Sequence, residues 1–492
     1  MSIITPPERR DAGHDTGRLT RTLHPEAHQV VYGAPNPAAD LATLRLTSRI
    51  DRVHVLGLRS SGLLTVAETA QLLDAIQTVE ALNYAPVLER PRPRGLYLVY
   101  EQVISELAGP GIGGKLHTGR SRNDLNATVA ILMTREGAER MVADGIRLLA
   151  ALLGRAEKYA HAVMPIHTHS QPAMPITYGY YLTGVALALA RDLAAVGHAA
   201  FDHDVCPLGA HAVAGTNVPL NTKLTARLLG FGSGPMHAVD SIASRDTSVR
   251  TLSAATLASI TVSRLAADLQ FWSTQEAGFV AFPDWLVGSS SAMPQKRNAF
   301  LLEHLKARPA QVLGALVAAC TAEKAAPFTN SIEVGTEAMA RVMPALDEVC
   351  DLLRLASLVV AGAQPVPDRM LGSATRGFVG ATAAANRLVA AGVPFREAHH
   401  VVGAAVRDAV VRGETRLDLP EAAGDAPELN ELVAEARFGG GPGALEAAMS
   451  HAHQLRQELV RWLRDRTRRQ DLDLKVMRVL LDAHSVGKEG SA

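Results

Sequence analysis

The sequence predicts an all-α protein, and three observations support that prediction. Alanine and leucine, two strong helix formers, dominate the composition, while aromatic residues make up only 4% of it. Apolar residues recur at helical rather than alternating spacing. Long segments with this spacing favour a helix bundle. They occupy residues 129–160, 178–198, 244–275, 301–323 and 336–363.

The segment 129–160 shows the helical pattern most clearly. Apolar residues such as Ile131 and Leu152 are interleaved with charged ones such as Glu136, which predicts a long helix with wide apolar coverage. A helix this apolar on more than one face favours a bundle that is shared between subunits. Clusters of Pro and Gly mark the ends of the segments, at residues 91–95, 109–114, 230–235 and 439–443.

The two ends of the chain follow a different pattern from the bundle segments. Residues 1–45 mix Pro, His, Arg and Asp without sustained periodicity, which predicts an irregular arm. Residues 487–492 are expected to fray. The first fifteen residues carry charge and proline where a signal peptide would need an apolar core. No apolar stretch reaches the roughly 18 residues expected of a membrane span, so no membrane partner is predicted.

Charge and cysteine content narrow the function classes further. Lys+Arg and Asp+Glu both total 49, so there is no basic surplus to neutralise a nucleic-acid backbone. The three cysteines, Cys206, Cys320 and Cys350, form no CxxC pattern, which argues against a disulfide framework or a thiolate metal site. These features predict a cytoplasmic protein without a nucleic-acid partner.

A serine-rich loop at residues 287–298 is the first segment whose side chains are suited to catalysis. It combines three hydroxyls with the cation of Lys296 and the amide of Asn298. One interpretation is a solvent-exposed Ser/Gly loop before a helix. The other is a loop that closes over a substrate, in which Ser290 or Ser291 reaches a C–H bond while the cation and amide stabilise the developing charge.

Two further segments carry groups that suit an anionic substrate. In residues 113–124, Arg122 offers a bidentate fork for a carboxylate, Asn123 an amide and Ser121 a hydroxyl, on a glycine-broken turn. In residues 164–172, Thr168 and His169 stand together. The His167-x-His169 spacing suggests a metal, but no further ligand accompanies it at helical spacing, so no metal site is predicted.

These three segments resemble signatures of one enzyme superfamily. The loop Gly288-Ser289-Ser290-Ser291 with Met293-Pro294, Lys296 and Asn298 resembles the serine loop of the aspartase/fumarase superfamily. Lys115 to Asp124 reads KLHTGRSRND, and Gly392 to His400 reads GVPFREAHH; both are similar to segments of the argininosuccinate lyase branch. The resemblance covers roughly residues 47–411.

The resemblance implies a fold and an assembly. It implies a three-domain all-α subunit with a central long-helix bundle that is shared in a homotetramer, each active site drawing on three subunits. The expected domains are an N-terminal arm and helical domain, a central bundle domain carrying the catalytic loop 286–300, and a C-terminal helical domain, over residues 1–117, 118–371 and 372–492 respectively. The family needs neither metal nor cofactor for catalysis.

Residue roles are also implied by the resemblance. Ser290 would be the catalytic base, with Ser291 as its rival, and Lys296 would stabilise the anionic intermediate. His169, paired with Glu303, would serve the leaving amine. The substrate would be bound by Ser121, Arg122, Asn123, Thr168, Ser291, Met293 and Asn298.

Two of the departures from the family pattern bear on the serine loop and on the substrate. Ser289 stands where the serine loop expects glycine, and Phe328, Asn330 and Glu333 replace the tyrosine, lysine and glutamine that contact the amine half of argininosuccinate. We therefore expect a C–N lyase that splits an N-substituted aspartate, such as ethylenediamine-disuccinate, by anti β-elimination into fumarate and an amine. The alternatives are argininosuccinate lyase itself and a catalytically inactive structural or binding homologue.

Overall fold

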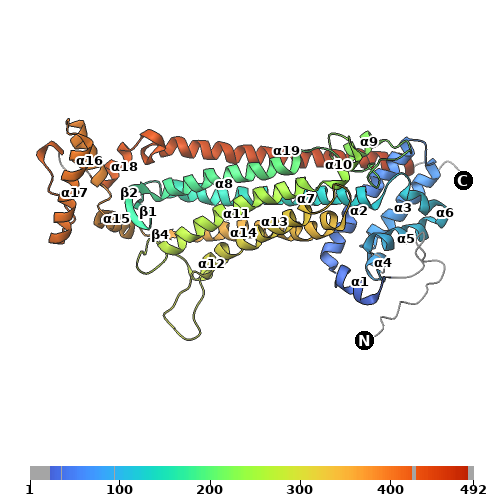
Figure 1. The fold of residues 1–492 in the computed structure, drawn as a ribbon, viewed down its shortest axis with the longest axis horizontal. Helices are drawn as coiled ribbons and strands as arrows, with labels where there is room; N and C mark the ends of the chain where they lie inside the picture. The colour runs from blue at the N-terminus through green and yellow to red at the C-terminus, as the bar shows by residue number, and fades with distance from the viewer. Residues whose placement is uncertain (1–22, 35, 93–94, 424–427, 486–492) are drawn as a thin grey trace.

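The computed structural model describes residues 23–34, 36–92, 95–423 and 428–485, and it is built from helices (Figure 1). Within these residues the strands are two short antiparallel pairs. One pair joins β1 (Val163–Thr168) to β2 (Gln171–Thr177), and the other joins β3 (Val280–Ala281) to β4 (Gln364–Pro365). The predicted all-α class is confirmed.

The long helices of the centre lie side by side along the molecule (Figure 1). Helix α7 packs against α8 and α14, and α11 packs against α8, α13 and α14. Shorter helices α9, α10 and α12 connect them. The bounds are α7 (Arg122–Lys158), α8 (Tyr178–Phe201), α9 (Thr222–Leu228), α10 (Ala238–Ala243), α11 (Asp246–Trp272), α12 (Phe300–Ala307), α13 (Pro309–Lys324) and α14 (Met339–Gly362).

Smaller helices gather at the two ends of this bundle (Figure 1). The N-terminal group is α1 (Pro25–Tyr32), α2 (Pro37–Ser60), α3 (Val66–Ala81), α4 (Ala85–Leu88), α5 (Leu96–Ala108) and α6 (Pro110–Gly113). The C-terminal group at the opposite end is α15 (Pro367–Arg376), α16 (Ala381–Ala390), α17 (Phe395–Arg412) and α18 (Leu429–Glu435). The last helix, α19 (Leu445–Ser485), returns along α7 and α8 and contacts α3 and α9.

The path of α19 bears on the division into three domains. Its 41 residues belong by sequence to the segment 372–492, yet they pack on the central bundle and on the N-terminal helices. The three-domain division therefore stays a prediction, because α19 belongs to the third region by sequence and packs against the other two.

The bundle core is made of aliphatic side chains from the facing helices. Leu148 and Leu152 of α7 are fully buried, as are Leu189 and Leu193 of α8. Gly145 lets α7 and α8 approach closely, because a Cβ at this position would lie 2.3 Å from Leu193 Cδ1. Truncating a buried leucine of this kind to alanine typically costs about 2–5 kcal/mol of stability.

Two expectations about helix boundaries are wrong. The segment 301–323 is not one helix, because Pro309 has no backbone N–H to continue α12 and instead starts α13 at its first turn. The described residues 25–34 and 36–45 are not an irregular arm, because most of them form α1 and α2. Asn36 caps α2 through a hydrogen bond from Ala39 N, and Pro37 follows it. Residues 1–22 and 486–492 lie outside the described residues.

Helix α8 qualifies the expectation that no segment could span a membrane. By length and composition alone its 24 residues are long and apolar enough. The helix packs against α7, α11 and α19 in the bundle, and the core helix of a soluble protein passes the same test. These contacts bury 39% of its most apolar window.

Candidate active site

The predicted carboxylate-binding residues lie at the start of α7. Ser121 is the N-cap residue of this helix, and its Oγ accepts a hydrogen bond from Asn123 N at 3.3 Å. Asn123 Nδ2 donates to Ala212 O at 3.2 Å, and the side chain of Arg122 is exposed. The start of a long helix presents unsatisfied N–H groups and a positive dipole end, which favour an anion.

Asp124 ties this segment to a second stretch of chain. Its buried carboxylate accepts hydrogen bonds from the backbone N–H groups of Ser121 at 3.0 Å, Gly209 at 3.0 Å and His211 at 2.9 Å. Burial raises the pKa of Asp124, and the three N–H groups oppose that rise. The Gly209–His211 stretch is thereby fixed against the start of α7.

Thr168 and His169 lie at the tip of the β1–β2 hairpin, and both are exposed. His169 and Ser170 have φ values of 50° and 61°, as a two-residue hairpin turn with left-handed residues requires. The neighbouring His167 instead packs edge-on against Phe271, with ring centroids 5.2 Å apart. Burial lowers the pKa of His167, in keeping with a structural role.

The serine loop is closed at its base and projects from the bundle just before α12 (Figure 1). Gly288 and Asn298 pair as an isolated antiparallel bridge, with both N–O distances at 2.8 Å. A Cβ at residue 288 would lie 3.1 Å from the Phe300 ring, so glycine suits this position. Arg297 anchors the loop by donating to Phe282 O at 2.9 Å and pairing with Asp284.

Within the loop, Ser290 differs from its neighbour. Its Oγ accepts hydrogen bonds from the backbone N–H groups of Ala292 at 3.3 Å and Met293 at 3.1 Å, and its side chain is half-buried. Ser291, Met293 and Lys296 are exposed. Asn298 is half-buried, and its Nδ2 donates to Ser289 O at 3.4 Å.

Glu303 lies on α12, three residues into the helix. Its carboxylate accepts a hydrogen bond from Gln270 Nε2 of α11 at 3.5 Å, and the same amide accepts from Lys306 Nζ at 2.5 Å. Among the hydrogen bonds of the described residues there is none between Glu303 and His169. The expected pairing of these two side chains is thus not made within this subunit.

The three residues that depart from the argininosuccinate pattern lie between α13 and α14. Phe328 is 69% exposed, and Asn330 and Glu333 are exposed as well. Glu333 begins a π-helical turn, η4 (Glu333–Ala338), a local geometry that is frequent at functional sites. A hydrogen bond from its own backbone N–H and another from Ser331 lower the pKa of Glu333.

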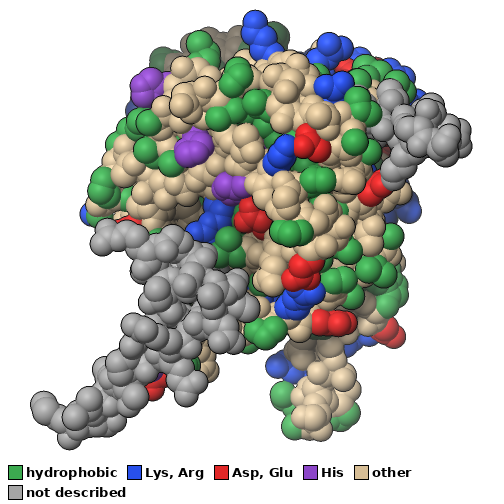
Figure 2. All heavy atoms as spheres, turned by 90° about the vertical axis from the view of Figure 1, so that its right-hand side faces the viewer, with side chains coloured by type: hydrophobic (Ala, Val, Ile, Leu, Met, Phe, Trp, Pro, Cys, Tyr) green, Lys and Arg blue, Asp and Glu red, His purple; other side chains and the backbone are tan. Residues whose placement is uncertain are grey.

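The subunit holds these segments far apart. Helix α7 has 37 residues, so about 55 Å separates Arg122 from the hairpin that follows the helix. The hairpin and the serine loop lie toward the end of the bundle that carries α15–α18, whereas α7 begins at the end that carries α1–α6 (Figure 1). That N-terminal end face carries basic and acidic side chains side by side (Figure 2). One subunit therefore does not bring the predicted residues together.

Comparison with known proteins assigns the chain to a family. Residues 96–314 match a lyase family, and residues 378–436 match the argininosuccinate lyase C-terminal family. EDDS lyase in complex with formate superposes with a TM-score of 0.85 at 26% identity, covering 98% of this chain and all of that one. An EDDS lyase variant with bound fumarate gives 0.84 at the same identity and coverage.

Residues 96–314 belong to the lyase family, and the C-terminal match makes the chain argininosuccinate-lyase-like. The likeness to EDDS lyase supports a fumarate-forming carbon–nitrogen lyase of the aspartase/fumarase superfamily. The class II fumarase of Schistosoma mansoni shares the fold, with a TM-score of 0.65 at 16% identity over 76% of this chain and 85% of that one.

Two residues of this lyase that sequence reasoning missed support predicted site residues. Asp124 holds the start of α7, and its signal was the Ser121-x-x-Asp124 capping box, which marks a helix start. Gln270 holds Glu303 from a distance of 33 residues along the chain. No local sequence pattern predicts a contact between residues so far apart in the chain.

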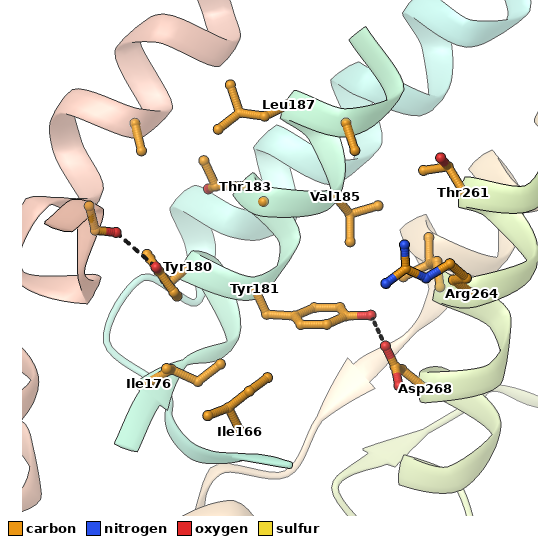
Figure 3. Close-up of a pocket in the computed structure, with 15 residues that line it drawn as sticks. Ile166, Ile176, Tyr180, Tyr181, Thr183, Val185, Leu187, Thr261, Arg264 and Asp268 are labelled. Atoms are coloured by element: carbon orange, nitrogen blue, oxygen red, sulfur yellow. Dashed lines mark hydrogen bonds between the residues drawn. The ribbon is translucent and has the colours of Figure 1, made fainter. Parts of the chain in front are cut away.

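A cavity of about 410 Å³ beside the hairpin is distinct from the predicted site (Figure 3). It lies between β1, α8 and α11, and its wall is mostly apolar. Tyr181 points across it and donates a hydrogen bond to Asp268, with Arg264 nearby. None of the predicted site residues lines this cavity.

Proposed function

We propose that this lyase splits the Cα–N bond of an N-substituted aspartate by anti β-elimination, with Ser290 as the base. The observation that carries the proposal is the pair of backbone N–H groups directed at Ser290 Oγ. Hydrogen bonds to the charged form of a group lower its pKa. Two such donors favour the alkoxide that must remove a proton from carbon.

The elimination then proceeds in two bond-breaking steps. The Ser290 alkoxide takes the Cβ proton, and the electron pair of that bond delocalises into the adjacent carboxylate. Lys296, Asn298 and the N–H groups of the loop stabilise the extra negative charge of the intermediate. Forming this charge accounts for the largest part of the activation free energy. The Cα=Cβ double bond forms as the Cα–N pair leaves with the nitrogen, and His169 with Glu303 serves the departing amine.

The two carboxylates of the succinyl group require cationic and neutral hydrogen-bond donors. Arg122 offers two parallel N–H groups, and Ser121, Asn123 and Thr168 add further polar contacts. A substrate held by both carboxylates has its Cβ–H fixed toward the base, which converts binding into rate.

We propose that the complete site forms in a homotetramer. The separation of about 55 Å along α7 requires that the start of α7 and the hairpin tip in one site come from different copies. The serine loop would come from a third copy. Apolar side chains that one subunit leaves exposed on the bundle helices would be covered by such an assembly. They include Leu257 and Ile260 of α11, Leu313 and Val317 of α13, and Leu358 of α14.

The amine half of the substrate is proposed to differ from arginine. Phe328 and Asn330 lack the hydroxyl and the cation that the argininosuccinate pattern places there, and Glu333 adds a carboxylate. Unpaired polar groups on a buried substrate cost about 1–3 kcal/mol each. Glu333 favours an amine that carries a second positive charge, as a diamine substituted with succinyl groups does. The likeness to EDDS lyase supports this choice.

Argininosuccinate lyase activity is the second candidate. It is favoured by the match of residues 378–436 to the argininosuccinate lyase C-terminal family and by the KLHTGRSRND segment. Failure of the gene to support growth of an arginine auxotroph would remove this candidate.

Release of fumarate, followed by its ultraviolet absorbance, tests the proposed function. The purified enzyme is assayed with ethylenediamine-disuccinate, with N-succinyl derivatives of neutral and cationic amines, and with argininosuccinate. We expect turnover of at least one N-succinyl diamine and weak or no turnover of argininosuccinate. Absence of fumarate release from every compound would refute the proposal and favour an inactive homologue.

A further inference from the structure

A buried ion pair lies directly behind the predicted carboxylate-binding segment. Arg120 Nη1 and Asp51 Oδ1 are 2.6 Å apart, and both side chains are fully buried. Asp51 comes from α2, whereas Arg120 immediately precedes Ser121. We propose that Arg120 and Asp51 are positioning residues for the elimination, which set the geometry of residues 121–123 without touching the substrate. This inference rests on the proposed function.

Further contacts extend from the guanidinium of Arg120. Its Nη2 donates to Tyr97 Oη at 2.8 Å, and Tyr97 Oη lies 3.3 Å from His117 Nδ1. The His117 ring also contacts the Glu101 carboxylate at 3.2 Å. The side chain of Arg120 is thus connected to Tyr97 and Glu101 of α5 and to His117 in the turn before Arg120.

The backbone of the same turn is held separately. His54 Nε2 lies within hydrogen-bond distance of Thr118 O, at 2.9 Å, and Arg120 N donates to His117 O at 3.4 Å. Asp124 fixes the far side of the segment through Ser121 N. Residues 121–123 therefore lie between two anchors, Arg120 on one side and Asp124 on the other.

Energetics indicate a role for the pair beyond folding. Removing two charges from water costs several kcal/mol per ion, and well-packed apolar residues often replace a buried ion pair without loss of stability. Apolar residues do not, however, fix the orientation of a side chain as hydrogen bonds do. The Arg120 guanidinium, held by a carboxylate and a phenol, has one orientation. That orientation is passed to Ser121 and Arg122 through the adjoining peptide bonds.

A double variant separates positioning from folding. Arg120→Met with Asp51→Leu removes both charges at similar volume and leaves no uncompensated ion. We expect a thermal midpoint within a few degrees of the wild type, a KM for the N-succinyl substrate about 10-fold higher, and a kcat changed less than about 3-fold. A merely structural pair would alter the amount of active enzyme, and thus the apparent kcat, but not KM.

A milder variant keeps the inference testable if the double variant does not fold. Tyr97→Phe removes only the hydroxyl that accepts from Arg120. We expect a KM rise of about 3-fold and a small fall in the thermal midpoint, because the buried Arg120 Nη2 loses its acceptor. The matched control is Tyr180→Phe, which removes a hydroxyl bonded to Gly440 O at 2.8 Å at the other end of the bundle; its KM should equal that of the wild type.

The outcomes distinguish this inference from the proposed function. If the wild-type enzyme releases fumarate and Tyr97→Phe has the KM of Tyr180→Phe, the positioning role is refuted. A folded double variant with wild-type KM refutes it as well. If the wild-type enzyme releases no fumarate from any N-succinyl amine, the proposed function itself fails.

Discussion

The choice between two adjacent serines depends on the direction of backbone N–H groups. Ser290 Oγ accepts from two of them, whereas no such bond to Ser291 Oγ occurs among the described residues. We predict that Ser290→Ala lowers kcat by about 1,000-fold, as loss of a general base does. Ser291→Ala should lower it by less than about 10-fold. Equal losses in the two variants, measured by fumarate release, would contradict this assignment.

Glu333 offers a second prediction for a single residue. Its carboxylate is exposed in the subunit and its pKa is lowered, so it is charged at neutral pH. Glu333→Gln should raise KM about 10-fold for an N-succinyl diamine, since the side chain loses the charge that attracts the second cation of the substrate. An N-succinyl amine without a second cation serves as the control substrate, and an equal rise for it would contradict the role.

Most identities of the candidate site could be predicted from the sequence, while its arrangement could not. Ser290, Arg122 and His169 stand in segments whose residue order is distinctive. Sequence order says nothing, however, of the backbone N–H groups that select Ser290, because these depend on the fold of the loop. Nor does it show that Glu303 contacts Gln270 in place of His169.

The start of α7 illustrates how a helix cap supports a site. Asp124 is both the N3 residue of the capping box and the acceptor for Gly209 N and His211 N. We predict that Asp124→Ala lowers the unfolding free energy by about 3 kcal/mol, because buried N–H groups lose a charged acceptor. Asp471→Ala on the exposed side of α19 should change it by less than about 0.5 kcal/mol. Thermal unfolding of both variants measures the difference, and similar midpoints would contradict the prediction.

Helical periodicity predicted the long elements because their apolar faces are wide and regular. It failed where a single residue overrides the pattern, as Pro309 does between α12 and α13. It also failed before residue 45, where α1 and α2 depend on their capping residues and proline starts more than on apolar spacing.

In the whole molecule, the predicted site residues lie at opposite ends of a long bundle. Arg122 begins α7, and the hairpin with His169 follows its far end, about 55 Å away. The exposed serine loop projects from the bundle just before α12 (Figure 1). The sequence indicated a shared bundle through the wide apolar coverage of residues 129–160 and through resemblance. No periodicity reveals which surfaces of two copies meet.

Co-refolding of two inactive variants tests the account most directly. Arg122→Ala loses the carboxylate fork, and Ser290→Ala loses the base, so each should be nearly inactive alone. If the site takes these residues from different subunits, mixed oligomers contain some sites with both residues intact. We predict that the refolded mixture releases fumarate from an N-succinyl amine at a rate well above either variant. A mixture as inactive as its parts, beside an active wild type that was refolded identically, would contradict the account.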